Sequence, residues 1–184
     1  MIRCYVTDRR HGNLLAHIAR AVANGVEMIQ VREKDLSARD LLALVEQVRD
    51  LAVGTPTQVL VNGRLDIALA ARLDGVHLPG DGLPAFRVRP HVRTLGISCH
   101  SIHEAMQAES DGVDYIIFGP VFETPGKKAV GIEALRRVVE SIRIPVLAIG
   151  GINEFNTPQV LEAGAQGIAG IRMFQSDDYK PDAH

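Results

Sequence analysis

The sequence predicts an α/β fold in which eight parallel strands close into a (β/α)8 TIM barrel. Two observations carry this prediction. Eight apolar runs of four to six residues recur along the chain, and segments with helical periodicity fill most of the gaps between them. Several runs are apolar throughout, as strands covered on both faces require. A doubly wound open sheet is the alternative, but the eightfold repeat and the lack of a GxGxxG motif after the first run favour the barrel.

The eight apolar runs give the predicted strands in chain order. They cover residues 2–7, 28–31, 58–61, 75–78, 94–98, 115–118, 146–149 and 167–171. In such barrels the functional groups lie where the strands end, on the loops at the carboxyl face. The residues that follow each run are therefore the candidates for a site.

Helices are predicted between the strands because apolar side chains recur there on one face. Segment 37–52 shows this spacing, and Ser37 is a candidate N-cap with Asp40 three residues further on. Segment 84–92 contains prolines and is predicted to be only weakly helical. The remaining helices are predicted at residues 14–24, 65–72, 102–110, 132–141 and 157–163.

The last outer helix of the barrel is predicted to be missing or reduced. After the eighth strand only residues 173–184 remain, and the sequence QSDDYKPDAH is polar and contains a proline. We expect one barrel domain over residues 1–175 and a polar tail over residues 176–184. A barrel wall left uncovered in this way is a candidate surface for a homodimer.

Composition excludes several classes of protein. Hydrophobic residues make up 46% of the 184 residues and the net charge is −2, which is typical of a globular chain and not of a general nucleic-acid binder. Cys4 and Cys99 have no metal-like spacing, which argues against a zinc site or a disulfide scaffold and favours a reducing, cytoplasmic location. No apolar run approaches the roughly 18 residues of a membrane span, and no signal peptide is recognisable.

Polar residues that follow the predicted strands form a set suited to anions. They are Arg32, Lys34, Asn62, Ser98, Thr124, Lys127 and Arg172. Phosphate oxygens accept hydrogen bonds from such cations, amides and hydroxyls. The Gly150-Gly151 turn after the seventh strand allows backbone N–H groups to approach a second phosphate closely. Each residue alone is typical of a solvated loop, but the joint pattern predicts a phosphate or diphosphate site at the barrel mouth.

Several motifs occur in a specific order along the chain. They are IQVREKDLS (29–37), VNGRLDIALA (61–70), DGVHL (74–78), GISCHS (96–101), DYIIFGPVFETPGKK (114–128) and PVLAIGGI (145–152). Together they resemble the family of thiamine phosphate synthase and its relative thiazole tautomerase. The resemblance extends from YVTD (5–8) to GIAGI (167–171) and thus covers nearly the whole chain.

The resemblance implies an enzyme of thiamine biosynthesis, a transferase that couples hydroxymethylpyrimidine diphosphate with thiazole phosphate. Its partners would be these small phosphorylated precursors, and its products thiamine phosphate and diphosphate. By resemblance Arg32 and Lys34 hold the diphosphate, and Asn62, Ser98 and Lys127 are further ligands of it. Loss of diphosphate would leave a carbocation that the thiazole nitrogen attacks. Such a reaction needs leaving-group neutralisation, by cations and usually Mg²⁺.

The same resemblance assigns the other substrate contacts. Gln30 would contact the pyrimidine ring, and Thr124 and Gly151 would serve the thiazole phosphate. Arg172 stands where the family has a serine near that phosphate, and an arginine there is a further candidate phosphate ligand.

The metal site implied by the family is altered in this chain. Two aspartates normally hold Mg²⁺, but both positions are glycine, Gly63 and Gly82. Asp81, one residue away from the second position, offers one carboxylate and therefore a weak Mg²⁺ site.

Two alternatives remain open. The Asn-Gly-Arg sequence after the third strand resembles the thiazole tautomerase branch, which moves a proton on a thiazole carboxylate phosphate and needs a base. That branch has a histidine where this chain has Pro120, so His100 is the candidate acid or base. Cys99 precedes His100, but neighbouring residues on a strand point to opposite faces, so the two are poor partners and Cys99 is expected to be buried. The second alternative is a non-catalytic binder of thiamine precursors.

Overall fold

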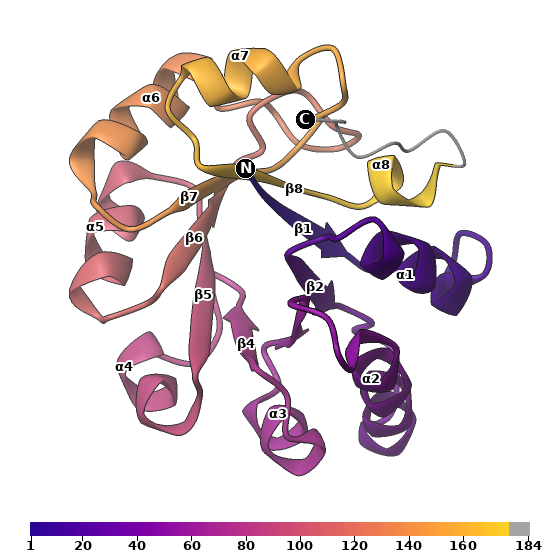
Figure 1. Ribbon diagram of the computed structural model, residues 1–184. Coiled ribbons are helices and arrows are strands. Elements are labelled where there is room, and N and C mark those ends of the chain that lie inside the picture. The colour runs from indigo at the N-terminus through magenta and orange to yellow at the C-terminus, as the bar shows by residue number, and fades with distance from the viewer. Residues whose placement is uncertain (177–184) are drawn as a thin grey trace.

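The structure is a computed structural model that describes residues 1–176. Its strands form one closed barrel in the order β1 to β8, with each strand parallel to its neighbours. Figure 1 shows the helices arranged around the outside of this barrel. The predicted (β/α)8 fold is therefore confirmed. Apart from Ser176, the polar tail predicted from the sequence lies outside the described residues.

The strands agree closely with the apolar runs of the sequence. All eight begin at the predicted residue and end within one residue of the predicted end. Pairing of Ile2 with Gly167 and of Tyr5 with Gly170 closes the barrel between the first and last strands. The strands are β1 (Ile2–Val6), β2 (Met28–Val31), β3 (Gln58–Asn62), β4 (Gly75–Leu78), β5 (Thr94–Cys99), β6 (Tyr115–Phe118), β7 (Val146–Ala148) and β8 (Gly167–Gly170).

The helices follow the predicted segments. Ser37 caps α2, since its hydroxyl oxygen accepts a hydrogen bond from the backbone N–H of Asp40 at 3.1 Å. No helix in the described part of the chain is long and apolar enough to cross a membrane. The helices are α1 (Leu14–Ala23), α2 (Ala38–Ala52), α3 (Leu65–Ala71), α4 (Ala85–Val88) with the 3-10 helix η1 (Arg89–His91), α5 (Ile102–Ser110), α6 (Ile132–Ser141), α7 (Thr157–Glu162) and α8 (Arg172–Gln175).

The last helix is reduced, as predicted, but it does not leave the outer face of β1 bare. The α8 helix has only four residues. Phe174 in this helix is fully buried and stacks on Tyr5, with ring centroids 5.3 Å apart. The side chain of Gln175 donates to the backbone oxygen of Asp8 at 2.8 Å. Within the described residues, the predicted uncovered wall is therefore covered at β1 by an aromatic pair.

Alternation along the strands divides the core into two clusters. The smaller cluster fills the barrel, and the larger one lies between the sheet and the helices. Side chains near the carboxyl ends of the strands thus line the mouth. The interior cluster consists of Cys4, Val6, Met28, Leu60, Tyr115, Ile117, Leu147 and Ala169.

Candidate functional site

A cavity of about 890 Å³ lies at the carboxyl ends of the strands. Its walls come from the ends of β1 to β8 and from the loops that follow them. Every residue that the sequence predicted for the site lines this one cavity. These residues are Gln30, Arg32, Lys34, Asn62, Asp81, Ser98, His100, Thr124, Lys127, Gly151 and Arg172. The structure thus brings together side chains from distant parts of the chain, while the role of each remains a prediction.

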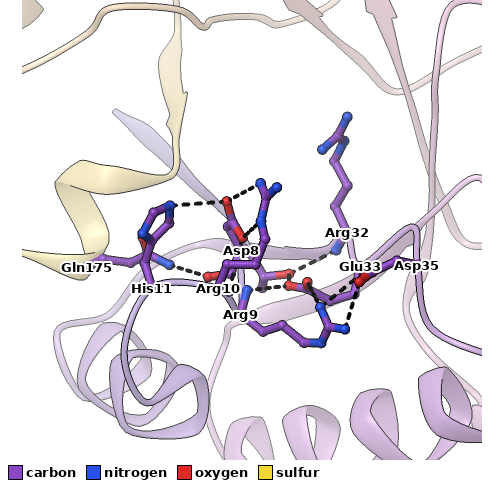
Figure 2. A network of polar contacts seen from close by, with 9 residues as sticks. Asp8, Arg9, Arg10, His11, Arg32, Glu33, Asp35 and Gln175 are labelled. Carbon is purple, nitrogen blue, oxygen red and sulfur yellow. Dashed lines mark hydrogen bonds and ion pairs between the residues drawn. The ribbon is translucent and has the colours of Figure 1, made fainter.

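In the Arg-Glu-Lys sequence after β2, the two cations line the cavity and the carboxylate between them does not. Arg32 and Lys34 line the cavity, whereas Glu33 does not line it and is only 6% exposed. The Thr7 hydroxyl donates to the Glu33 carboxylate at 2.7 Å, and the backbone N–H of Arg9 donates to it at 3.1 Å. Figure 2 shows the Arg32 side chain pointing away from Glu33. The carboxylate therefore does not neutralise the cation that faces the cavity.

Other arginines near the mouth are paired with carboxylates. Arg9 contacts Asp35 at 2.8 Å, and Arg10 contacts Asp8 at 2.7 Å. Hydrogen bonds from Arg10 lower the pKa of Asp8 to about 2, against the opposing effect of partial burial. By contrast, no carboxylate within residues 1–176 forms an ion pair with any of the four cations that line the cavity. Those four are Arg32, Lys34, Lys127 and Arg172.

The balance of charge in the cavity favours an anion. Among residues 1–176, four cationic side chains line it against two carboxylates, Asp81 and Glu123. Across the described residues, no group of three or more His, Cys, Asp or Glu side chains lies close enough to hold a metal ion. The protein alone therefore offers an anion site with few metal ligands.

The loops after β6 and β7 pack closely and place the second half of the site. Gly151 has φ +65°, and a Cβ atom there would meet the Glu123 carbonyl oxygen at 2.9 Å. The backbone N–H of Lys127 donates to the carbonyl oxygen of Thr124 at 3.0 Å, which forms a tight turn. These contacts bring Thr124 and Lys127 to the same wall as the glycine turn.

His100 and its neighbour Cys99 point to different environments, as expected from strand alternation. Cys99 is buried, and burial raises the pKa of its thiol to about 12. His100 Nδ1 donates to the carbonyl oxygen of Gly119, and its backbone N–H donates to the Glu104 carboxylate at 2.6 Å. In the neutral ring, Nε2 then carries no proton and can accept one. The predicted acid or base role of His100 depends on this nitrogen.

His77 also belongs to this region, and the sequence favours a structural role for it over a ligand contact. It is 1% exposed, and its ring nitrogens contact the Ser98 hydroxyl at 2.9 Å and the Tyr115 hydroxyl at 3.0 Å. Burial lowers the pKa of His77 to about 3, with a further contribution from the charge of Arg32. Strand alternation in the sequence indicates this position, because it places His77 on the inward face of β4, as it places Ser98 on the inward face of β5.

Comparisons with known proteins identify several thiamine-phosphate synthases as relatives of this chain. A family model described as thiamine monophosphate synthase matches residues 4–174. The chain is 45% identical over 182 residues to a putative thiamine-phosphate synthase of Geobacter sulfurreducens, covering 94% of this chain and 85% of that protein. It is 41% identical to putative thiamine-phosphate synthase 2 of Aquifex aeolicus, covering 92% and 95% of the two chains. Thiamine phosphate pyrophosphorylase from Pyrococcus furiosus superposes with a TM-score of 0.90 at 35% identity, over 97% of this chain and 89% of that one.

Proposed function

This chain belongs to the thiamine monophosphate synthase family, and from that membership we propose that it couples hydroxymethylpyrimidine diphosphate to thiazole phosphate. The products are thiamine phosphate and diphosphate, which makes the protein a transferase. The observation that carries the proposal is the cavity in which Asn62 and Ser98 meet four cations that form no ion pair with any carboxylate of residues 1–176. A tautomerase would have no use for so many donors to a diphosphate.

The diphosphate side of the cavity acts on the leaving group. The carbon–oxygen bond of the pyrimidine methylene breaks, and its electron pair leaves with the diphosphate. Arg32, Lys34 and Lys127 neutralise the charge that develops there, while Asn62 and Ser98 donate hydrogen bonds to it. The lone pair of the thiazole nitrogen then forms the new bond to carbon, so no side chain has to remove a proton.

Another part of the cavity receives the second substrate. Thr124, Gly151 and Arg172 line it, and we assign them to the thiazole phosphate. Gln30 lies inside the barrel end of β2 and is almost fully buried, which suits a contact to the pyrimidine ring. A buried amide gives orientation as well as affinity, because its donors and acceptors must all find partners.

Asp81 is the proposed protein ligand of Mg²⁺. Gly63 and Gly82 stand where the family is expected to have metal-binding aspartates, so one carboxylate has to suffice. Mg²⁺ is commonly held by one or two carboxylates together with substrate phosphates and water, and this donor set fits such an ion. When bound, the metal would add to the neutralisation of the departing diphosphate.

The proposal is tested with both substrates and Mg²⁺, by following thiamine phosphate. We expect coupling, and we expect Arg32→Ala and Lys127→Ala each to lower kcat/KM by about 10- to 100-fold, the effect of losing a charge-assisted contact. Arg136→Ala is the matched control, because Arg136 is exposed on α6, outside the cavity.

A parallel reaction supplies the thiazole carboxylate phosphate tautomer alone. Formation of the aromatic isomer there, without coupling in the first reaction, would identify a tautomerase instead. If coupling occurs and neither cavity variant slows it more than a few-fold, the assignment of the diphosphate side is wrong.

A further inference from the structure

A buried chain of three polar side chains runs from the barrel core to the cavity. The Tyr115 hydroxyl lies 3.0 Å from His77 Nδ1, and His77 Nε2 lies 2.9 Å from the Ser98 hydroxyl oxygen. Tyr115 is 4% exposed, and His77 is likewise buried, while Ser98 lines the cavity. The three residues come from β6, β4 and β5. Only the last member of the chain can therefore touch a ligand.

Gly96 makes this chain of contacts possible. It is in register with His77 on one side and with Tyr115 on the other, so it lies between them in the sheet. A Cβ atom at Gly96 would meet Cζ of Tyr115 at 2.2 Å. The tyrosine ring therefore occupies the space that a side chain on β5 would need, and its hydroxyl reaches across that strand to His77.

The direction of the two hydrogen bonds follows from counting protons. Burial keeps both rings neutral, because it lowers the pKa of His77 and raises the pKa of Tyr115 well above its usual value. A neutral histidine carries one N–H. If Tyr115 donates to Nδ1, then Nε2 donates to the Ser98 oxygen, and both buried donors are satisfied.

The reverse arrangement leaves a donor without a partner. If Nδ1 donated to the Tyr115 oxygen, the phenolic O–H would have no hydrogen-bond acceptor among the residues that the structure describes. A buried unsatisfied donor is strongly unfavourable, whereas an unused lone pair on oxygen is tolerated more easily. The first arrangement is therefore favoured.

We propose that Tyr115 and His77 form a hydrogen-bonded relay that orients the Ser98 hydroxyl group, with its proton directed toward the cavity. Ser98 then donates a hydrogen bond to an oxygen of the bound diphosphate. With its oxygen already accepting from His77, the Ser98 hydroxyl is left to donate, as an anion requires. In the reverse arrangement Ser98 would donate to His77 and present lone pairs to the anion. His77 and Tyr115 are thus positioning residues. Only the identity of the anion rests on the proposed function.

The relay itself is tested without any catalysis. Nitrogen-15 NMR of the His77 ring distinguishes the two neutral tautomers. At neutral pH we expect a protonated Nε2 and an unprotonated Nδ1. A proton on Nδ1 would overturn the relay, whether or not the protein couples the two substrates.

The link to the anion is tested with a double-mutant cycle. Calorimetry measures the binding of inorganic diphosphate in the presence of Mg²⁺. We expect Tyr115→Phe to weaken binding by about 5- to 10-fold in the unchanged protein and by less than about 2-fold in the Ser98→Ala background, because the tyrosine acts only through Ser98. Equal losses in both backgrounds, or no loss in the unchanged protein, would overturn the inference.

A second pair of variants distinguishes the loss of the hydrogen bond to Ser98 from a change in packing at residue 77. His77→Gln keeps an N–H donor near the position of Nε2, whereas His77→Leu does not. We expect the glutamine variant to bind diphosphate more tightly than the leucine variant, and equal affinities would count against the relay. If the unchanged protein binds no diphosphate, the proposed function and the anion part of this inference both fail, while the NMR result still decides the tautomer.

Discussion

Glu33 shows how a carboxylate can lie between two cations of an anion site without weakening it. Its carboxylate accepts hydrogen bonds from the Thr7 hydroxyl and from the backbone N–H of Arg9. Arg32 and Lys34 line the cavity, which Glu33 does not. The same Thr7 hydroxyl accepts from the backbone N–H of Arg32 at 2.9 Å, so the carboxylate also fixes the loop that carries the cations.

Acid is expected to destabilise the protein through His77. As the pH falls below about 6.5, the unfolded chain protonates this histidine, whereas the native ring stays neutral until about pH 3. The unfolded state then binds more protons, so the free energy of unfolding falls as the pH falls, by up to about 1.4 kcal/mol per pH unit. Urea unfolding of the unchanged protein and of His77→Gln between about pH 6 and pH 4 measures this slope.

The slope of the free energy of unfolding against pH separates the titration of His77 from the pH-independent effect of the substitution. The substitution changes the contacts of residue 77 by an amount that does not depend on pH, but it removes the titrating group, so the stability of His77→Gln should fall less steeply in acid. Carboxylates such as Asp8 titrate in both proteins and cancel in the comparison. Parallel curves would show that His77 is not held neutral in the native state.

At the scale of single elements, the strands were predictable and the contacts across them were not. Each strand is a short apolar run between polar segments, so its limits are a local property of the sequence. The cavity residues were predictable for a related reason, because the carboxyl ends of all strands meet at one face. The contacts of His77 were not predictable, because they depend on register with Gly96 and Tyr115, which local sequence does not encode.

The short α8 helix is expected to contribute more stability than its length suggests. Phe174 is 0% exposed and stacked on Tyr5, so Phe174→Ala should lower the free energy of unfolding by about 3–5 kcal/mol. Phe155→Ala is the matched control, since this phenylalanine is 86% exposed on the loop before α7 and should change stability by less than about 0.5 kcal/mol. Urea denaturation measures both, and similar small changes would mean that α8 is not part of the stable core.

At the scale of the whole molecule, the cavity exists only when the barrel is closed. Its lining runs from Val6 to Met173, and these residues reach the mouth from the ends of all eight strands or from the loops that follow them. Closure by pairing of β8 with β1 fixes the distance between the first and last of these loops. An unfolded chain disperses the four cations, so an anion that needs them together binds the native state alone.

Binding of diphosphate should therefore stabilise the entire fold. At a concentration of about 100 times Kd, inorganic diphosphate with Mg²⁺ adds about 2.7 kcal/mol to the free energy of unfolding. For a chain of this size that corresponds to a rise of roughly 5–10 °C in Tm. Thermal unfolding should show this rise in the unchanged protein and in the surface variant Arg136→Ala, and a much smaller one in Lys127→Ala. Sodium chloride at the same ionic strength is the second control, because screening alone cannot reproduce a site-specific shift. An equal rise in the Lys127→Ala protein would mean that diphosphate stabilises the chain from somewhere other than this cavity.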